Sequence, residues 1–474
     1  MFQKCFRNLI IAGFWILIPQ LVLAHAGHRG FVMLLPTDLF MMGGGVVVVF
    51  TFVSMVFVTR ETDIEKFSIP KIHNDEISPK LWVSSLTLFT LVLLVWIGFT
   101  GNRDPMKNLL PMTFWVFFWI GMTVVSAIFG NIWSFVSPWT VIERIIAKLK
   151  KLYIVREISL DNSRSFSYLP ALILFAGFAW FELIHPSPMD PDVLAKFVLL
   201  YIFVTTLGII FFGGNKWIEK GEPFTVYFRM VGWLSPIYLK EIVGKNEVVS
   251  KHIALRWPCA GLLRIDSLSK SGVAFVILVL STVSFDGLSR TFWWLSMVGI
   301  NPLEYPGRTS MVLINTVGLF STFLVFSGAY YFTQRLTFFI NSEISKNSSF
   351  IFSMIPIAFG YHFAHYLPTF LVDVQYAIIS ISDPFDIGWD LLGTSDWVVT
   401  SSYLTNYDSV VFIWSFQVLG IVLAHIGAVI VSHYLQLEAS KSQKHSIIGQ
   451  IPSTLLMVAY TVFGLWLLST PVYG

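Results

Sequence analysis

The sequence predicts an all-α fold, a polytopic transmembrane helical bundle of about ten helices that follow a cleaved signal peptide. Three observations predict it. Of the 474 residues, 55% are hydrophobic and only 12% are charged, whereas about a quarter of the residues of a soluble protein are charged. Apolar segments long enough to cross about 30 Å of hydrocarbon recur along the chain, and Lys and Arg gather in alternate loops. The composition excludes both an ordinary water-soluble domain and a disordered chain.

The charge balance and the cysteines exclude further classes. The chain has 31 Lys and Arg residues against 28 Asp and Glu residues, a net charge of +3, which is too small to indicate nucleic-acid binding. Its two cysteines, Cys5 and Cys259, cannot form a disulfide framework. The predicted partners are the lipid bilayer and a small-molecule substrate or a metal ion. The sequence identifies no protein partner.

Residues 1–24 have the features of a secretory signal peptide. Lys4 and Arg7 precede an apolar stretch, and the small residues Ala24 and Ala26 follow it, as a cleavage site requires. The alternative is an uncleaved first transmembrane helix. We predict cleavage, which leaves residues 25–474 as a single integral membrane domain.

Ten apolar segments after the signal predict the membrane helices. With residue 25 outside the cytoplasm, alternation assigns every loop to one side, and the predicted cytoplasmic loops hold 23 Lys and Arg residues against five in external segments. This asymmetry agrees with the positive-inside rule and places the mature N-terminus and the C-terminus on the external side. The segments lie near residues 38–59, 81–100, 111–137, 168–185, 197–213, 271–298, 309–333, 348–372, 409–434 and 448–470.

Few ionisable residues lie inside these segments, and each is a candidate functional residue because burying it in a membrane costs at least a few kcal/mol. Glu182 ends the fourth segment, and Asp286 and Arg290 lie four apart in the sixth. This spacing suits an ion pair along one helix face. Arg290 is also a candidate clamp for an anionic substrate oxygen, with Asp286 or Glu182 as the supporting carboxylate.

Three histidines share a depth in the predicted bundle. His362 and His365 are three apart and so face the same way, and His425 lies at a similar depth in the next segment. Imidazole binds Zn, Cu and Fe well, so this set predicts a divalent transition-metal site. Haem held by one histidine from each helix is a second interpretation. The third is that each histidine hydrogen-bonds a neighbouring helix and only fixes packing.

The mature N-terminus offers a further candidate metal site. Cleavage after Ala24 would let the amine and the imidazole of His25 chelate one metal, with His28 assisting. Cleavage after Ala26 would abolish this arrangement. A terminus without a fixed structure is the alternative.

The chain has no Lys or Arg from Asn347 to Ser440, and its external part, residues 373–408, predicts an acidic and aromatic cap. Such a cap could attract cations toward the histidines. Alternatively, the Asp side chains serve as caps and turns. The acidic residues are Asp373, Asp383, Asp386, Asp390, Asp396 and Asp408.

Several motifs together carry a family resemblance. They are Arg256-Trp257-Pro258, the stretches 284–291 and 360–367, residues 375–397 and the His-Gly-rich start of the mature chain, with Leu34-Leu35-Pro36. They resemble those of a family of bacterial inner-membrane proteins in which Asp-Leu-Pro is usual at the last position. The function of this family is mostly unassigned, and some members are named fenitrothion hydrolase. The resemblance implies a bacterial inner membrane, with the periplasm as the external side, and hydrolysis of organophosphate esters. It carries over no catalytic residues.

These observations favour a membrane protein with a histidine-rich metal site open to the external face. As an enzyme, it would use metal-activated water to attack an ester. One alternative is a metal or small-solute transporter, which needs polar groups that continue toward the cytoplasm, where His433 is the clear candidate. The other alternative is a haem-binding membrane electron carrier.

Overall fold

The computed structural model describes residues 37–57, 69–73, 81–150, 167–243, 249–265, 267–341, 350–439 and 443–470. Within these ranges, eight helical spans are long and apolar enough to cross a membrane, which confirms the predicted all-α, multi-pass membrane fold. They are α2 (Thr37–Val56), α3 (Leu81–Thr100), the continuous α4 (Leu109–Pro111), η2 (Met112–Gly121) and α5 (Met122–Phe129), then α9 (Pro191–Phe212), α12 (Lys270–Ser289), α14 (Arg308–Ile340), α16 (Tyr407–Ala439) and α18 (Ile451–Ser469). The predicted signal peptide lies outside the described residues.

The two remaining predicted segments coincide with α8 (Leu169–Leu183) and α15 (Ile351–Ser382). Two predictions were too long, because 111–137 and 271–298 each contain a helix end. Gly130 ends α5 with a φ of 89°, a conformation that glycine adopts without steric cost. After α12, the Thr291 side chain accepts a hydrogen bond from the Trp294 N–H and starts the separate helix α13 (Phe292–Met297).

Shorter helices connect these spans at the ends of the bundle and inside it. α11 is almost wholly buried, since it lies among the membrane helices and not on their surface. The short elements are α6 (Trp133–Val136), α7 (Trp139–Lys150), α10 (Gly214–Lys220), α11 (Pro223–Gly232), α17 (Gln443–Gly449) and the 3₁₀ turns η4 (Ala260–Arg264), η5 (Pro302–Glu304) and η6 (Ser402–Leu404).

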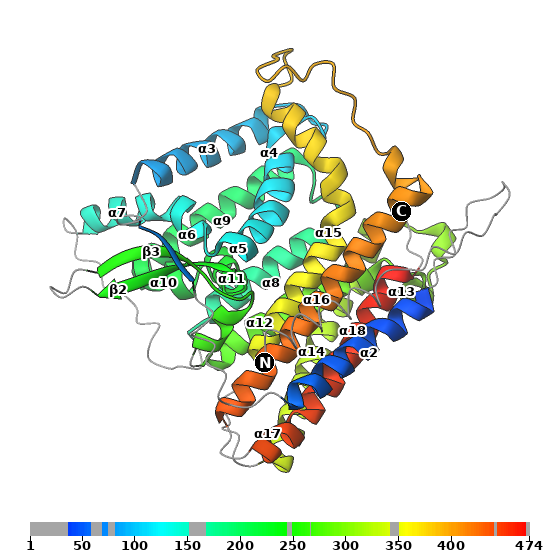
Figure 1. Cartoon of the computed structure of the whole chain (residues 1–474). Coiled ribbons are helices and arrows are strands. Elements are labelled where there is room, and N and C mark those ends of the chain that lie inside the picture. The colour runs from blue at the N-terminus through cyan, green and yellow to red at the C-terminus, as the bar shows by residue number, and fades with distance from the viewer. Residues whose placement is uncertain are drawn as a thin grey trace.

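A small antiparallel sheet accompanies the helices, and the sequence analysis did not predict it. Its strands are β1 (Ile69–His73), β2 (Ile237–Val243) and β3 (Val249–Leu255), in the order β1-β3-β2. Ile237 pairs with Leu255 across β2 and β3. Figure 1 shows the sheet on one flank of the molecule, near α7 and α10.

The long helix α15 organises the bundle (Figure 1). It packs along α16 and also contacts α12 and η2, while α2 pairs with α18 on the outer side of α16. On the other side of α15, α3 packs against α9, and α8 packs against α12. Residues of α8, α12 and α15 therefore meet in the interior.

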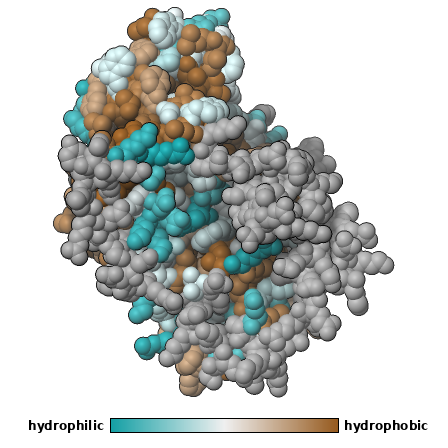
Figure 2. Space-filling model, turned by 90° about the vertical axis from the view of Figure 1, so that its left-hand side faces the viewer, coloured by the Kyte–Doolittle hydropathy of each residue, from teal (hydrophilic) through white to brown (hydrophobic). Residues whose placement is uncertain are grey.

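Much of the outer surface is apolar, as lipid contact requires. On α3, Trp82 and Phe89 are about two-thirds exposed, and on α14 Leu313 is 75% exposed. Figure 2 shows one face on which apolar side chains cover the upper part and hydrophilic side chains gather in a band across the middle. Exposure of large apolar side chains is unfavourable in water, but contact of these side chains with the hydrocarbon of a bilayer is favourable.

The predicted cap of residues 373–408 divides into two parts. Residues 373–382 continue α15, and 407–408 begin α16. The segment 383–406, here called the cap segment, connects the two helices at one end of the bundle, called the cap end below. Alternation of the spans makes the cap end the predicted external face.

Candidate functional site

The candidate site lies where α8, α12 and α15 meet toward the cap end. It contains a connected set of polar side chains, called the carboxyl cluster below, from all three helices. Its members are Glu182, Asp286, Arg290, His365 and Tyr366.

Asp286 is the centre of the carboxyl cluster. Its Oδ1 lies 3.1 Å from Nη2 of Arg290, and its Oδ2 lies 2.7 Å from Nε2 of His365. The Asp286 side chain is 3% exposed, whereas those of His365 and Arg290 are 23% and 43% exposed. One buried carboxylate thus holds two nitrogen-bearing side chains that reach the surface. The i,i+4 contact between Asp286 and Arg290 is the one expected from their spacing.

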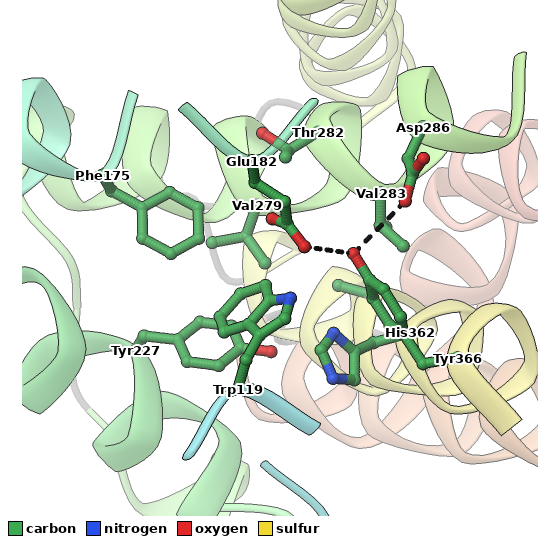
Figure 3. A pocket seen from close by; sticks show the side chains of 11 residues that line it. Trp119, Phe175, Glu182, Tyr227, Val279, Thr282, Val283, Asp286, His362 and Tyr366 are labelled. Carbon is green, nitrogen blue, oxygen red and sulfur yellow. Dashed lines mark hydrogen bonds between the residues drawn. The ribbon is translucent and has the colours of Figure 1, made fainter. Parts of the chain in front are cut away.

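Tyr366 joins the two carboxyl groups of the cluster, as Figure 3 shows. Its hydroxyl lies within hydrogen-bond distance of Glu182 Oε1, at 2.6 Å, and of Asp286 Oδ2, at 3.2 Å. The sequence analysis missed Tyr366, because a tyrosine in an aromatic-rich membrane segment is an ordinary packing residue.

A small internal cavity adjoins the cluster (Figure 3). Glu182, Asp286, His362 and Tyr366 line it together with apolar and aromatic side chains. The free space is about that of one water molecule. His362 packs against Trp119, with ring centres 5.0 Å apart, and against Tyr366, at 4.7 Å. Its Nε2 is buried and has no hydrogen-bond partner among the described residues.

Irregular helices surround this cavity. η2, which carries Trp119, is a π-helix, a rare form that is frequent at functional sites. α15 contains Pro356 and Pro368. Pro368 has no N–H to donate to the carbonyl of Ala364, four residues earlier. The side-chain amide of Gln417, from α16, donates to that carbonyl instead, at 2.5 Å.

The end of α8 that carries Glu182 is held from α14. The guanidinium of Arg308, the first residue of α14, donates to the backbone carbonyls of Glu182 and His185 at 3.1 and 3.2 Å. A cation at a helix C-terminus interacts favourably with the helix dipole and satisfies the last carbonyls. Arg308 thus fixes the position of Glu182.

The structure places His425 apart from the other two predicted metal ligands. Its ring neighbours are Tyr361 and Tyr460, with centres 6.5 and 6.1 Å away, and its Nδ1 contacts the carbonyl of Ile421. The described part of the chain contains no group of three or more His, Cys, Asp or Glu side chains that could hold a metal ion. We therefore assign no metal ligands there. His25 and His28 lie outside the described residues, and a bound metal or haem stays a prediction.

Two acidic residues of the cap segment, Asp383 and Asp390, serve its turns. Asp383 accepts hydrogen bonds from the N–H groups of Ile387 and Gly388, and Asp390 accepts from Thr394 and Ser395. The hydrogen bond from the Ser395 hydroxyl lowers the pKa of Asp390, with the backbone N–H groups adding to it. These contacts support the alternative interpretation of the acidic residues as caps and turns.

No protein-family model matches the chain, and no curated protein or solved structure is significantly similar to it. The resemblance to the fenitrothion hydrolase family therefore stays a prediction. Function is inferred below from the geometry of the site.

Proposed function

We propose that this membrane protein hydrolyses a small apolar ester of the organophosphate type at the carboxyl cluster. His365 serves as the general base, Asp286 orients it, and Arg290 binds the anionic oxygen that develops on the substrate. The observation that supports this proposal is the double contact of the buried Asp286 with His365 and Arg290, both of which reach the surface.

The contact with Asp286 sets which nitrogen of His365 is basic. When Nε2 carries the proton, its N–H donates a hydrogen bond to Asp286, and Nδ1 of the neutral imidazole is left as a proton acceptor. A histidine oriented in this way by a buried carboxylate is a recurrent general base. Arg290, also held by Asp286, brings a permanent positive charge and five N–H donors to the same place.

The proposed reaction needs only the ester and one water molecule. His365 Nδ1 takes a proton from a water molecule while the water oxygen forms a bond to phosphorus. The bond from phosphorus to the leaving oxygen breaks, and the imidazolium returns its proton to the leaving group or to water. Arg290 stabilises the negative charge that gathers on the other phosphorus oxygens. Each step uses side chains of the carboxyl cluster and one water molecule.

The test is the turnover of a chromogenic 4-nitrophenyl phosphotriester by the purified protein in detergent or nanodiscs. His365→Gln should lower kcat by roughly 100- to 10,000-fold, the usual contribution of a general base. Arg290→Gln should lower kcat by roughly 100-fold or more, as loss of a charge-stabilising donor does.

A matched control is His185→Gln. His185 also lies at the cap end, but its Nδ1 accepts a hydrogen bond from the Ser187 N–H and its ring packs against Phe181, outside the carboxyl cluster. Its replacement should therefore leave kcat within about twofold of the wild type. A phosphotriester that turns over equally fast in wild type and His365→Gln would exclude the proposal.

A second candidate function, transport of a metal or a small solute, has its own support. At the end of the bundle opposite the cap end, His433 Nδ1 lies 2.9 Å from Gln450 Oε1, and Gln436 donates to Ser432 and is 3.4 Å from Ser453. All five side chains are buried. Polar groups therefore occur in the inner half of the bundle, as a transporter requires. The test is the uptake of a radiolabelled divalent metal into proteoliposomes. Uptake by the wild type that is lost in His433→Leu would favour transport.

A further inference from the structure

The hydrogen bonds of Tyr366 constrain the protons of the two carboxyl groups beside it. A tyrosine hydroxyl carries one proton and can donate only one hydrogen bond at a time. Its oxygen nevertheless lies 2.6 Å from Glu182 Oε1 and 3.2 Å from Asp286 Oδ2. Both contacts are favourable only if one carboxyl group is a carboxylic acid and donates to the tyrosine oxygen. Two carboxylates would leave one pair of oxygens in repulsion.

The other contacts of the cluster decide which carboxyl group is neutral. Asp286 faces the Arg290 guanidinium at 3.1 Å and the His365 ring at 2.7 Å, so its negative charge is compensated. Glu182 is 8% exposed and has no ion pair among the described residues. A buried carboxylate without a cation is very costly, and the group takes up a proton instead.

The remaining groups that face Glu182 do not replace this missing cation. Arg308, from α14, is nearby, but it donates to the backbone carbonyls at the end of α8. Trp119 from η2 and Tyr227 from α11 line the cavity as neutral rings. His362, from α15, also lines it, with a buried Nε2 that finds no partner in the described part of the chain.

We propose that Glu182 is a proton-binding site, a carboxylic acid at neutral pH that Tyr366 connects to Asp286. The proton of Glu182 can pass to the Tyr366 oxygen while the Tyr366 hydroxyl proton passes to Asp286 Oδ2. This exchange leaves Glu182 as a carboxylate and Asp286 as an acid, so charge and protons are conserved. Nε2 of His365 contacts the same Oδ2. In the neutral tautomer that carries its proton on Nδ1, this Nε2 can take the proton from Oδ2, so the path ends at a partly exposed imidazole. The cluster then moves protons between the buried cavity and the cap end, whether or not it also cleaves an ester.

Glu222 provides a contrast within the same chain. It is fully buried at the start of α11, but it accepts four hydrogen bonds, from the N–H groups of Phe224 and Thr225 and the hydroxyls of Tyr201 and Thr225. These donors satisfy an ionised carboxylate. Both glutamates are therefore buried, but they differ in the number of hydrogen-bond donors that face the carboxyl group.

The test is infrared spectroscopy of the purified protein at pH 7, which separates the C=O stretch of a carboxylic acid from the bands of carboxylates. The wild type should show a carboxylic-acid band that shifts in D₂O and is absent from Glu182→Gln. Glu222→Gln, the matched buried control, should keep the band. Tyr366→Phe should keep it too but shift its frequency, because the hydrogen bond from Glu182 is lost.

Two results would overturn the proposal. One is a carboxylic-acid band that survives Glu182→Gln and disappears in Asp286→Asn, which would place the proton on the other carboxyl group. The other is a Tyr366→Phe spectrum with an unshifted band. None of these measurements uses turnover, so they stand apart from the test of ester hydrolysis.

Discussion

Among the glycines in the described ranges, Gly464 of α18 leaves the least room for an added Cβ atom. A Cβ atom built on Gly464 would lie 0.6 Å from Oη of Tyr361 and 1.7 Å from its Cζ. Tyr361 is buried and its hydroxyl donates to the carbonyl of Tyr460, so the ring has little room to move away. Only glycine allows α18 to approach α15 this closely, as small residues commonly do in membrane bundles.

Gly464→Ala should therefore destabilise the protein, although alanine is the better helix former. Overpacking costs about 1–3 kcal/mol and sometimes more, against about 1 kcal/mol gained in helix propensity. We expect a lower thermal unfolding midpoint in detergent. Gly177→Ala in α8 is the matched control, because its added Cβ would meet no atom within 4 Å beyond the adjacent residues and backbone of its own helix. This variant should unfold at the wild-type temperature or above. Equal midpoints for the two variants would contradict this account.

At the scale of one element, α15 depends on a side chain from its neighbour. Pro368 removes one backbone hydrogen bond of the helix, and Gln417 of α16 replaces it at the Ala364 carbonyl. In hydrocarbon, where no water satisfies a free carbonyl, such a replacement is needed. Pro368 also lies two residues after Tyr366, so the contact with Gln417 is close in sequence to the carboxyl cluster.

Gln417→Leu should lower the free energy of unfolding by about 1–3 kcal/mol, the cost of a buried unpaired carbonyl. Adding Pro368→Ala should recover part of this loss, since the alanine N–H can bond to Ala364 within the helix. The measurement is a double-mutant cycle in detergent denaturation. If the two substitutions are merely additive, Gln417 does not compensate for Pro368.

At the scale of the whole molecule, contacts at the cap end join three connections. Asn102 donates to Asp386, and Lys107 lies 4.0 Å from it, which ties the α3–α4 connection to the cap segment. Arg103 lies 4.0 Å from Asp190, in the α8–α9 connection. Exposed ion pairs of this kind contribute little stability. They do join the three connections at one end of the bundle, which agrees with the predicted alternation of the spans.

Cysteine labelling tests which face this is. Asp396→Cys, in the exposed cap segment, should react with an impermeant maleimide on intact cells, whereas Lys216→Cys, in the exposed part of α10, should react only after permeabilisation. The wild-type protein serves as the background control for labelling. Desolvation raises the pKa of the Cys259 thiol to about 12, so little reactive thiolate forms at neutral pH. The reverse labelling pattern would invert the predicted orientation.

The sequence by itself determined the helical fold of this chain, because membrane insertion is governed by local hydropathy. Each of the ten predicted apolar segments overlaps an observed helix. It also selected Glu182, Asp286, Arg290 and His365, since a charge in hydrocarbon is costly wherever it lies along the chain. The ion pair of Asp286 and Arg290 followed from their spacing along one helix.

Only the tertiary structure decided which of these residues meet. It joined Glu182 to Asp286 through Tyr366, a residue without a distinguishing signal, and it placed His425 against Tyr361 and Tyr460 instead of beside His365. It also paired β1 with β3 across about 180 residues of sequence. Depth in the membrane can be read from the sequence, but the rotation of each helix about its axis cannot. That rotation follows from packing contacts such as Tyr361 against Gly464, which form only between distant parts of the chain.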